Sequence, residues 1–175
     1  MRRLAAIGIA LTMAAACGSD SPTTPSTNTG PIVFTAALSA ANEVPAISNA
    51  DANGRGTATI TFNVTRDSAT GNVTGGGAVT FAAQLTGFPA GTVVRNAHIH
   101  TGAAGVVGPV LVDTTLTPAS PVTLDANGAG TLNLTNSTLT QADATSIVAN
   151  PGGFYFNVHT AVNPAGAVRG QLVRQ

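Results

Sequence analysis

Apolar and polar residues alternate along most of the chain in short stretches. In residues 57–66, Ala58, Ile60, Phe62 and Val64 alternate with threonine and asparagine, which is the period of a half-buried β-strand. Turn-forming residues separate this stretch from others like it. Strands at such spacing predict an all-β fold, an antiparallel β-sandwich or a flattened barrel. We expect about eight strands, at residues 32–38, 57–66, 78–85, 92–100, 110–116, 131–134, 154–160 and 168–173.

Two other stretches depart from this alternation. Residues 140–149 are predicted to form one short helix, with Thr138 or Thr140 as its N-cap and residues 150–152, Asn-Pro-Gly, as its end. The three consecutive glycines at residues 75–77 predict a turn or a bulge, since no phosphate-loop lysine follows them.

A seven-residue segment occurs twice with one change, at residues 51–57 and at residues 125–131. Each copy begins with Asp-Ala-Asn-Gly and precedes a predicted strand. Asn-Gly supplies a positive φ angle and the aspartate can close an Asx turn, so both copies predict turns. The alternative is a calcium loop, which would need more carboxylates at each copy.

The N-terminus has the pattern of an export signal. Arg2 and Arg3 precede an apolar run that ends in small residues and is followed at once by Cys17. The run is shorter than the ~20 residues of a transmembrane helix. We interpret residues 1–16 as a signal peptide. Cys17 resembles the lipidated cysteine of bacterial lipoproteins, although Ala14 stands where that motif usually has leucine; the alternative is an ordinary signal peptide with an incidental thiol.

The segment after the cysteine differs from the rest of the chain. Residues 18–31 contain three prolines and no large apolar side chain, so they cannot build a core. We therefore expect residues 17–31 to be a flexible linker and residues 32–175 to be a single β domain.

Composition excludes several classes of function. Charged residues make up 8% of the chain and the formal net charge is zero, which argues against nucleic-acid binding. The chain has no lysine, so a Schiff-base lysine and a phosphate-loop lysine are excluded. Its single cysteine rules out an intrachain disulfide.

The three histidines carry the strongest chemical signal. His98 and His100 are two residues apart on one predicted strand and so share a face, and His159 lies on the polar face of a later strand. If the two strands are neighbours, three imidazoles meet, and such a set suits Zn²⁺ or Cu²⁺. The alternative is structural: the histidines bond to turn backbone and to each other.

Other chemistry is sparse. Glu43 is the only glutamate and follows the first predicted strand, while Arg169 lies in the last one. An ion pair between the two side chains would brace the two ends of the domain. The Gly-x-Ser-x-Gly motif of serine hydrolases is absent from the sequence. A redox or hydrolytic enzyme at a histidine-bound metal stays the weakest of the alternatives.

Three segments stand out in order: residues 34–45, Ala97-His98-Ile99-His100-Thr101-Gly102 with residues 105–110, and Phe156-Asn157-Val158-His159-Thr160 with residues 163–172. Together they resemble the CHRD domain, a family named after chordin and common in bacterial secreted proteins. The resemblance spans about residues 32–174 and includes all three histidines, Glu43 and Arg169. It implies an extracellular domain with no settled enzymatic activity. Ala165 and Ala167 depart from the family's usual ending, so a glutamate expected there is missing.

The two histidine strands are also similar to those of the copper-zinc superoxide dismutase sandwich, which favours a Greek-key-like architecture. Dismutase activity is not expected, because that enzyme needs more histidines than this chain has. The leading hypothesis is an exported, membrane-anchored and monomeric binding or structural domain of the cell envelope, at the outer membrane or cell surface, and otherwise secreted. The runner-up is a zinc or copper protein that uses His98, His100 and His159. The sequence does not name a protein or small-ligand partner.

Overall fold

The structure, a computed structural model, describes residues 29–175. The proposed signal peptide of residues 1–16, Cys17 and most of the expected linker lie outside this range. The first strand begins at Ile32, directly after the proline that ends the predicted linker.

All strands within residues 29–175 join one antiparallel sheet of ten strands, which confirms the all-β prediction. The order across the sheet is β5-β4-β8-β9-β1-β2-β3-β7, while β10 pairs with β1 and β6 pairs with β4. The strands are β1 (Ile32–Ser39), β2 (Arg55–Arg66), β3 (Val73–Thr86), β4 (Val93–Thr101), β5 (Val110–Asp113), β6 (Val122–Thr123), β7 (Gly130–Leu139), β8 (Phe154–Thr160), β9 (Val168–Gln171) and β10 (Val173–Arg174).

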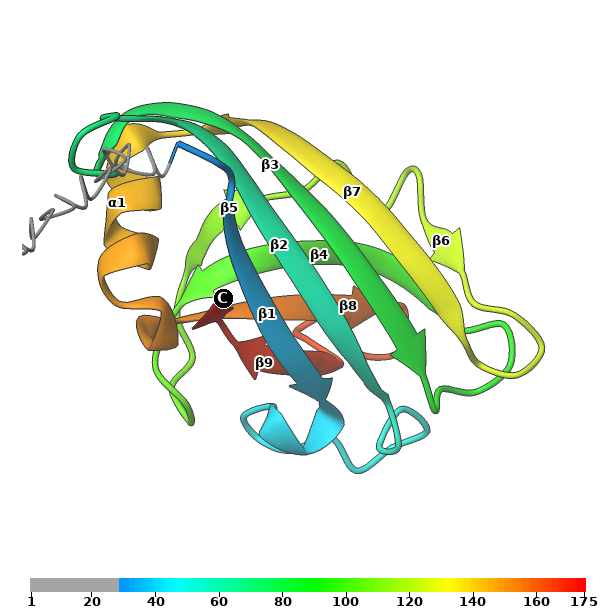
Figure 1. Cartoon of the computed structure of the whole chain (residues 1–175). Coiled ribbons are helices and arrows are strands. Elements are labelled where there is room, and N and C mark those ends of the chain that lie inside the picture. The colour runs from blue at the N-terminus through cyan, green and yellow to red at the C-terminus, as the bar shows by residue number, and fades with distance from the viewer. Residues whose placement is uncertain (1–28) are drawn as a thin grey trace, which may run out of the picture.

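The sheet curls into two layers and nearly closes. Figure 1 shows β1, β2, β3 and β7 side by side in one curved layer, with β4, β8 and β9 crossing behind them. The gap between β5 and β7 is bridged just beyond β5, where the Thr115 N–H donates to the Thr135 carbonyl at 3.0 Å. Beside it, the Asn136 side chain donates to the Asp113 carbonyl at 2.6 Å. The fold is therefore a flattened barrel.

The core lies between the layers and is filled by alternate residues of the strands. Ile60 and Phe62 of β2 are fully buried, as the period-two pattern predicts. Phe81 of β3 stacks on Phe156 of β8 with ring centroids 5.4 Å apart, so the two layers are joined by an aromatic contact at the centre.

Helix α1 (Gln141–Ala149) closes one end of the barrel. Thr140 is its N-cap, one of the two predicted caps, and accepts a hydrogen bond from the Asp143 N–H. Two 3-10 turns, η1 (Ala40–Asn42) and η2 (Pro151–Gly153), follow β1 and α1. No helix within residues 29–175 is long and apolar enough to cross a membrane.

The repeated segments flank β3 symmetrically. Gly56 in β2 and Gly130 in β7 both pair with Leu85 of β3, one from each side. Both copies of the segment therefore have the same structural role, because each precedes a strand that pairs with β3 in the same register.

The two repeated turns differ in their aspartates. The Asp125 carboxylate accepts from the Asn127 and Ala129 N–H groups at 2.8 and 2.9 Å, so the predicted Asx turn is confirmed there. The prediction is wrong for Asp51, whose fully buried carboxylate accepts instead from Thr160 and Asn163 at 2.6 and 2.7 Å. The first turn lies against the end of β8, where the Thr160 hydroxyl and the Asn163 amide are within reach of the Asp51 carboxylate.

Some boundaries differ from the sequence prediction. The glycines at residues 75–77 form no turn but lie within β3, beside a β-bulge in its pairing with β7. A Cβ at Gly77 would collide with the Asn63 carbonyl, so the glycines permit close approach of strands. β5 ends at Asp113 rather than at residue 116, and the short β6 was not predicted.

Candidate functional site

The three histidines lie on two neighbouring strands, so the condition under which their imidazoles can meet is fulfilled. β4 pairs with β8, so that Asn96 faces His159 and His98 faces Asn157. The histidines point away from the core, because their neighbours Ala97, Ile99 and Val158 fill it. The outer face of the β4–β8–β9 layer is therefore the polar one.

Strict alternation along residues 92–100 places Val94 on the same face as His98 and His100, and this prediction is wrong. Val94 is fully buried in the core. The pairing of β4 with β8 shifts between Val94 and Asn96, and such a bulge reverses the faces of the residues before it. Alternation holds only on the histidine side of the bulge.

Loops cover this polar face and bury the histidines. His100 Nδ1 lies 3.0 Å from the Gly108 carbonyl oxygen, in the loop between β4 and β5. His159 Nδ1 lies 3.1 Å from the Pro164 carbonyl oxygen, in the loop between β8 and β9. His100 and His159 are 8% and 6% exposed, so the cluster lies beneath the surface although it lies outside the core.

The imidazoles are close enough to share one ion. His98 Nδ1 lies 3.2 Å from His159 Nε2, and one ring nitrogen from each of the three residues falls within 4.8 Å of the others. Two nitrogens on one tetrahedral zinc are about 3.3 Å apart, given bonds of about 2.0–2.1 Å. The first pair already has this spacing, and the longest of the three separations would have to shorten by at most about 1.5 Å.

Hydrogen bonds fix the tautomers of two rings. A carbonyl oxygen only accepts, so His100 and His159 each carry their proton on Nδ1 and leave Nε2 as a lone pair. The His100 Nε2 atom is buried and has no hydrogen-bond partner. The third ring, His98, has its Nε2 3.3 Å from the Asp113 carboxylate.

Burial lowers the pKa of all three histidines. For His159 the fall is from 6.5 to about 4, and the neighbouring His98 and His100 add to it. The pKa values of His98 and His100 also fall, mainly through burial, although Asp113 partly opposes this. The neutral imidazoles that bind metal ions therefore predominate at neutral pH.

An aromatic stack leads from the histidines to a second polar group. The His100 ring stacks on Tyr155 at 4.9 Å, with 8° between the planes. On β9, the Arg169 guanidinium carbon lies 4.6 Å from the centre of the same tyrosine ring. Arg169 also neighbours Asn157 in the strand pairing, as His98 does on the other side.

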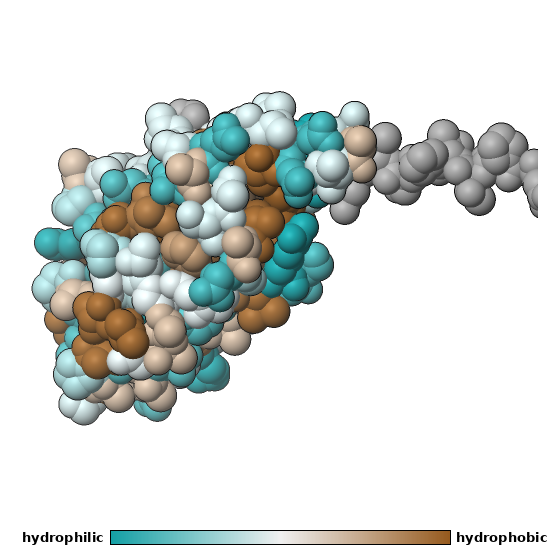
Figure 2. Space-filling view, turned by 90° about the vertical axis from the view of Figure 1, so that its left-hand side faces the viewer, coloured by the Kyte–Doolittle hydropathy of each residue, from teal (hydrophilic) through white to brown (hydrophobic). Residues whose placement is uncertain are grey.

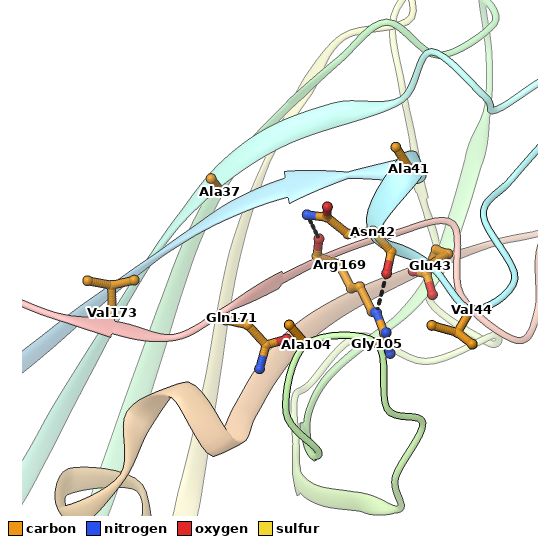
Figure 3. A pocket seen from close by; sticks show the side chains of 10 residues that line it. All are labelled: Ala37, Ala41, Asn42, Glu43, Val44, Ala104, Gly105, Arg169, Gln171 and Val173. Carbon is orange, nitrogen blue, oxygen red and sulfur yellow. Dashed lines mark hydrogen bonds between the residues drawn. The ribbon is translucent and has the colours of Figure 1, made fainter.

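Figure 3 shows the pocket that Arg169 lines, together with Glu43 and loop residues 104–105. Burial raises the pKa of Glu43 to about 7, although the Arg169 charge partly opposes this. Glu43 Oε1 and Arg169 Nη2 are both buried without a hydrogen-bond partner. The other two nitrogens of the Arg169 guanidinium, Nε and Nη1, donate to backbone carbonyls. The ion pair between Glu43 and Arg169 stays a prediction.

The sequence did not single out several residues around the histidines. Asp113 reaches His98 through the pairing of β4 with β5, and Gly108 and Pro164 contribute only carbonyl groups. Nothing in the local pattern marks a backbone acceptor. Tyr155 and Asn157 share the predicted polar face with His159, and that alternation is the signal that finds them.

Comparison with family models matches residues 34–172 to the model described as the CHRD domain. The match includes all three histidines, Glu43 and Arg169. No curated protein matches the chain.

Proposed function

We propose, from the premise that this chain belongs to the CHRD domain family, that it is an exported, membrane-anchored and non-catalytic binding domain. The family supports a non-enzymatic binding or structural role. The observation that favours binding is the loop-covered polar face, where buried polar atoms of Glu43, Asn157 and Arg169 lack partners. Buried polar groups are normally hydrogen-bonded, so these donors and acceptors are available to a polar ligand.

Export and anchoring follow from the N-terminal pattern. Acylation of Cys17 would place the domain at the outer membrane or the cell surface, with residues 18–31 as a spacer. Stable attachment requires more than one acyl chain, which a lipidated N-terminal cysteine provides.

The anchor is tested by expressing the full chain and Cys17→Ser in a bacterium supplied with radiolabelled palmitate. The wild type is expected to take up label and to enter the detergent phase, whereas Cys17→Ser does neither. Ser19→Ala, two residues away, serves as the control. Equal labelling of wild type and Cys17→Ser would exclude the anchor.

A second candidate function is binding of Zn²⁺ or Cu²⁺ by His98, His100 and His159. One observation favours it. With its proton on Nε2, His98 can donate a hydrogen bond to the Asp113 carboxylate. Its Nδ1 lone pair then points at the Nε2 lone pair of His159, 3.2 Å away, and the two repel each other. With its proton on Nδ1, it directs the Nε2 lone pair at the carboxylate. A neutral His98 can therefore hydrogen-bond to only one of its two neighbours, Asp113 or His159. A cation bound between the Nδ1 of His98 and the Nε2 of His159 would accept both lone pairs and leave the Nε2 proton for Asp113.

The second candidate is tested by metal analysis of the mature chain purified without chelator. Zinc or copper is expected at about one ion per chain, lost in His98→Ala and kept in Asn96→Ala on the same strand. Added metal should also raise the melting temperature, because an ion that binds only the folded state stabilises it. A metal-free protein whose melting temperature does not change with either ion would contradict metal binding. His98 would then bond to both neighbours by taking up a second proton.

A further inference from the structure

The pocket beside Glu43 and Arg169 has features that the histidine cluster does not explain. Its volume is about 550 Å³, which is within the range of ligand sites. Arg169 is 2% exposed and Glu43 is 9% exposed. Each keeps one polar atom without a partner, a donor on Arg169 Nη2 and an acceptor on Glu43 Oε1.

Arg169 is held rigidly by contacts with the protein. Its Nε donates to the Asn42 carbonyl at 2.6 Å and its Nη1 donates to the Val106 carbonyl at 3.0 Å. The Tyr155 ring lies against the guanidinium. Figure 3 shows the side chain extended between η1 and the β4–β5 loop. Its orientation is therefore fixed before any ligand arrives, which lowers the entropic cost of binding.

Two exposed valines line the same pocket, and two more follow one of its lining residues in the sequence. Val44 and Val173 line it and are 43% and 56% exposed, and Val106 and Val107 follow its lining residue Gly105 at 52% and 65%. Figure 2 shows hydrophobic patches that reach the surface among hydrophilic residues. Large apolar side chains gathered at a pocket mouth are typical of sites that bind proteins or peptides.

We infer that this pocket binds the backbone of an extended peptide segment with small apolar side chains. A peptide N–H would donate to Glu43 Oε1, a peptide C=O would accept from Arg169 Nη2, and the valines would contact the peptide side chains. A neutral amide satisfies a donor and an acceptor at once, whereas an anion would be repelled by Glu43 when that group is ionised. The inference rests on the proposed function as a binding domain and names the partner's chemistry.

Access to the two atoms requires a small movement at the tip of the β4–β5 loop, because both atoms are closed off from solvent. Ala104 and Gly105, which line the pocket, are exposed. Gly105 has a positive φ of 80°, and a Cβ there would meet nothing within 4 Å. The required movement is confined to these two residues, so that the Val106 carbonyl keeps its bond to Arg169 Nη1.

The test is a titration of the ¹⁵N-labelled mature chain, followed by NMR, with the blocked peptide Ac-Ala-Val-Val-Ala-NH₂. Saturable shifts are expected at the Arg169 Nε–H and at the backbone amides of Val44, Gly105 and Val173. Val173→Ser, which changes an exposed valine that lines the pocket, should weaken binding at least threefold. Val162→Ser should not, since Val162 is 57% exposed but lies outside this pocket.

Esters in place of single amides test the hydrogen bond to Glu43. The peptide in which an ester replaces the amide that donates to Glu43 is expected to bind the wild type about fivefold more weakly than the all-amide peptide. The same two peptides should bind the Glu43→Ala variant equally. Absence of saturable shifts would mean that ordered water alone satisfies the two atoms, and the inference would fall. Equal shifts with isovalerate would also overturn it, in favour of an apolar anion. Neither result affects metal uptake or acylation of Cys17, so the proposed function is judged separately.

Discussion

At the scale of single residues, two kinds of buried ionisable group respond to pH in opposite directions. The histidines have lowered pKa values, and for His159 the fall is to about 4. Glu43 has a pKa raised to about 7. Burial disfavours the charged form in each case, and the charged form is the protonated one for histidine and the ionised one for glutamate.

The pH dependence of stability follows from these shifts. Between pH 6.5 and 4 the unfolded chain binds more protons at His159 than the folded protein does, so stability falls as pH falls. Between pH 4.5 and 7 the folded protein binds more protons at Glu43, so that contribution to stability is present below pH 4.5 and is lost as pH rises.

The prediction at this scale is that Glu43→Gln gains stability relative to the wild type as pH rises from 4.5 to 8. The gain should be on the order of 1–2 kcal/mol, since a pKa unit is worth about 1.4 kcal/mol before screening by solvent. Urea denaturation at a series of pH values measures it. A difference between the two proteins that stays constant with pH would show that the Glu43 carboxyl titrates normally.

At the scale of elements, the sequence predicted the features that depend only on residues close together in the chain. The alternation in residues 57–66 located β2, and the His-X-His spacing put two imidazoles on one face. Val94 was misplaced because a bulge is set by the partner strand β8, which the local pattern does not contain. Asp113 reaches the histidines through the pairing of β5 with β4, and Gly108 and Pro164 reach them from loops; strand partners and loop paths both depend on long-range packing.

The prediction at this scale concerns the close contact between β9 and β1. A Cβ at Gly170 would collide with the Ala37 carbonyl, so Gly170→Ala should push β9 away from β1. We expect a loss of about 1–3 kcal/mol in unfolding free energy, as for other overpacked sites. Gly152→Ala is the control, because its Cβ meets nothing within 4 Å. Equal stability of the two variants, measured in urea, would show that β9 adjusts freely.

At the scale of the whole molecule, stability depends on contact between the two layers of the barrel. The sheet is almost continuous, yet its halves meet face to face through side chains such as Phe81 and Phe156. The layer with β4, β8 and β9 carries the polar groups on its outer face. Packing on its inner face therefore holds that layer in place.

Phe81→Ala is expected to lower the unfolding free energy by about 3–5 kcal/mol, because it leaves a cavity between the layers. Phe154→Ala should cost less, since Phe154 is only partly buried. Chemical denaturation compares the two variants, and NMR shifts of the histidine rings report whether the outer face changes as well. A loss below about 1 kcal/mol would mean that the layers are held mainly by backbone pairing.

The pairing of β1 has a mechanical consequence. β1 is bonded to β2 along its whole length on one edge, and to β10 and β9 on the other. The segment that leads back to Cys17 enters at Ile32, whereas the pocket is lined at the other end of β1 by η1 and by Arg169 of the neighbouring strand β9. A pull between an anchor and a partner that holds Arg169 would enter through β1 and leave through β9, and would load the hydrogen bonds of β1 in shear, all at once. Force spectroscopy between residues 30 and 169 should record one high rupture force rather than stepwise unzipping.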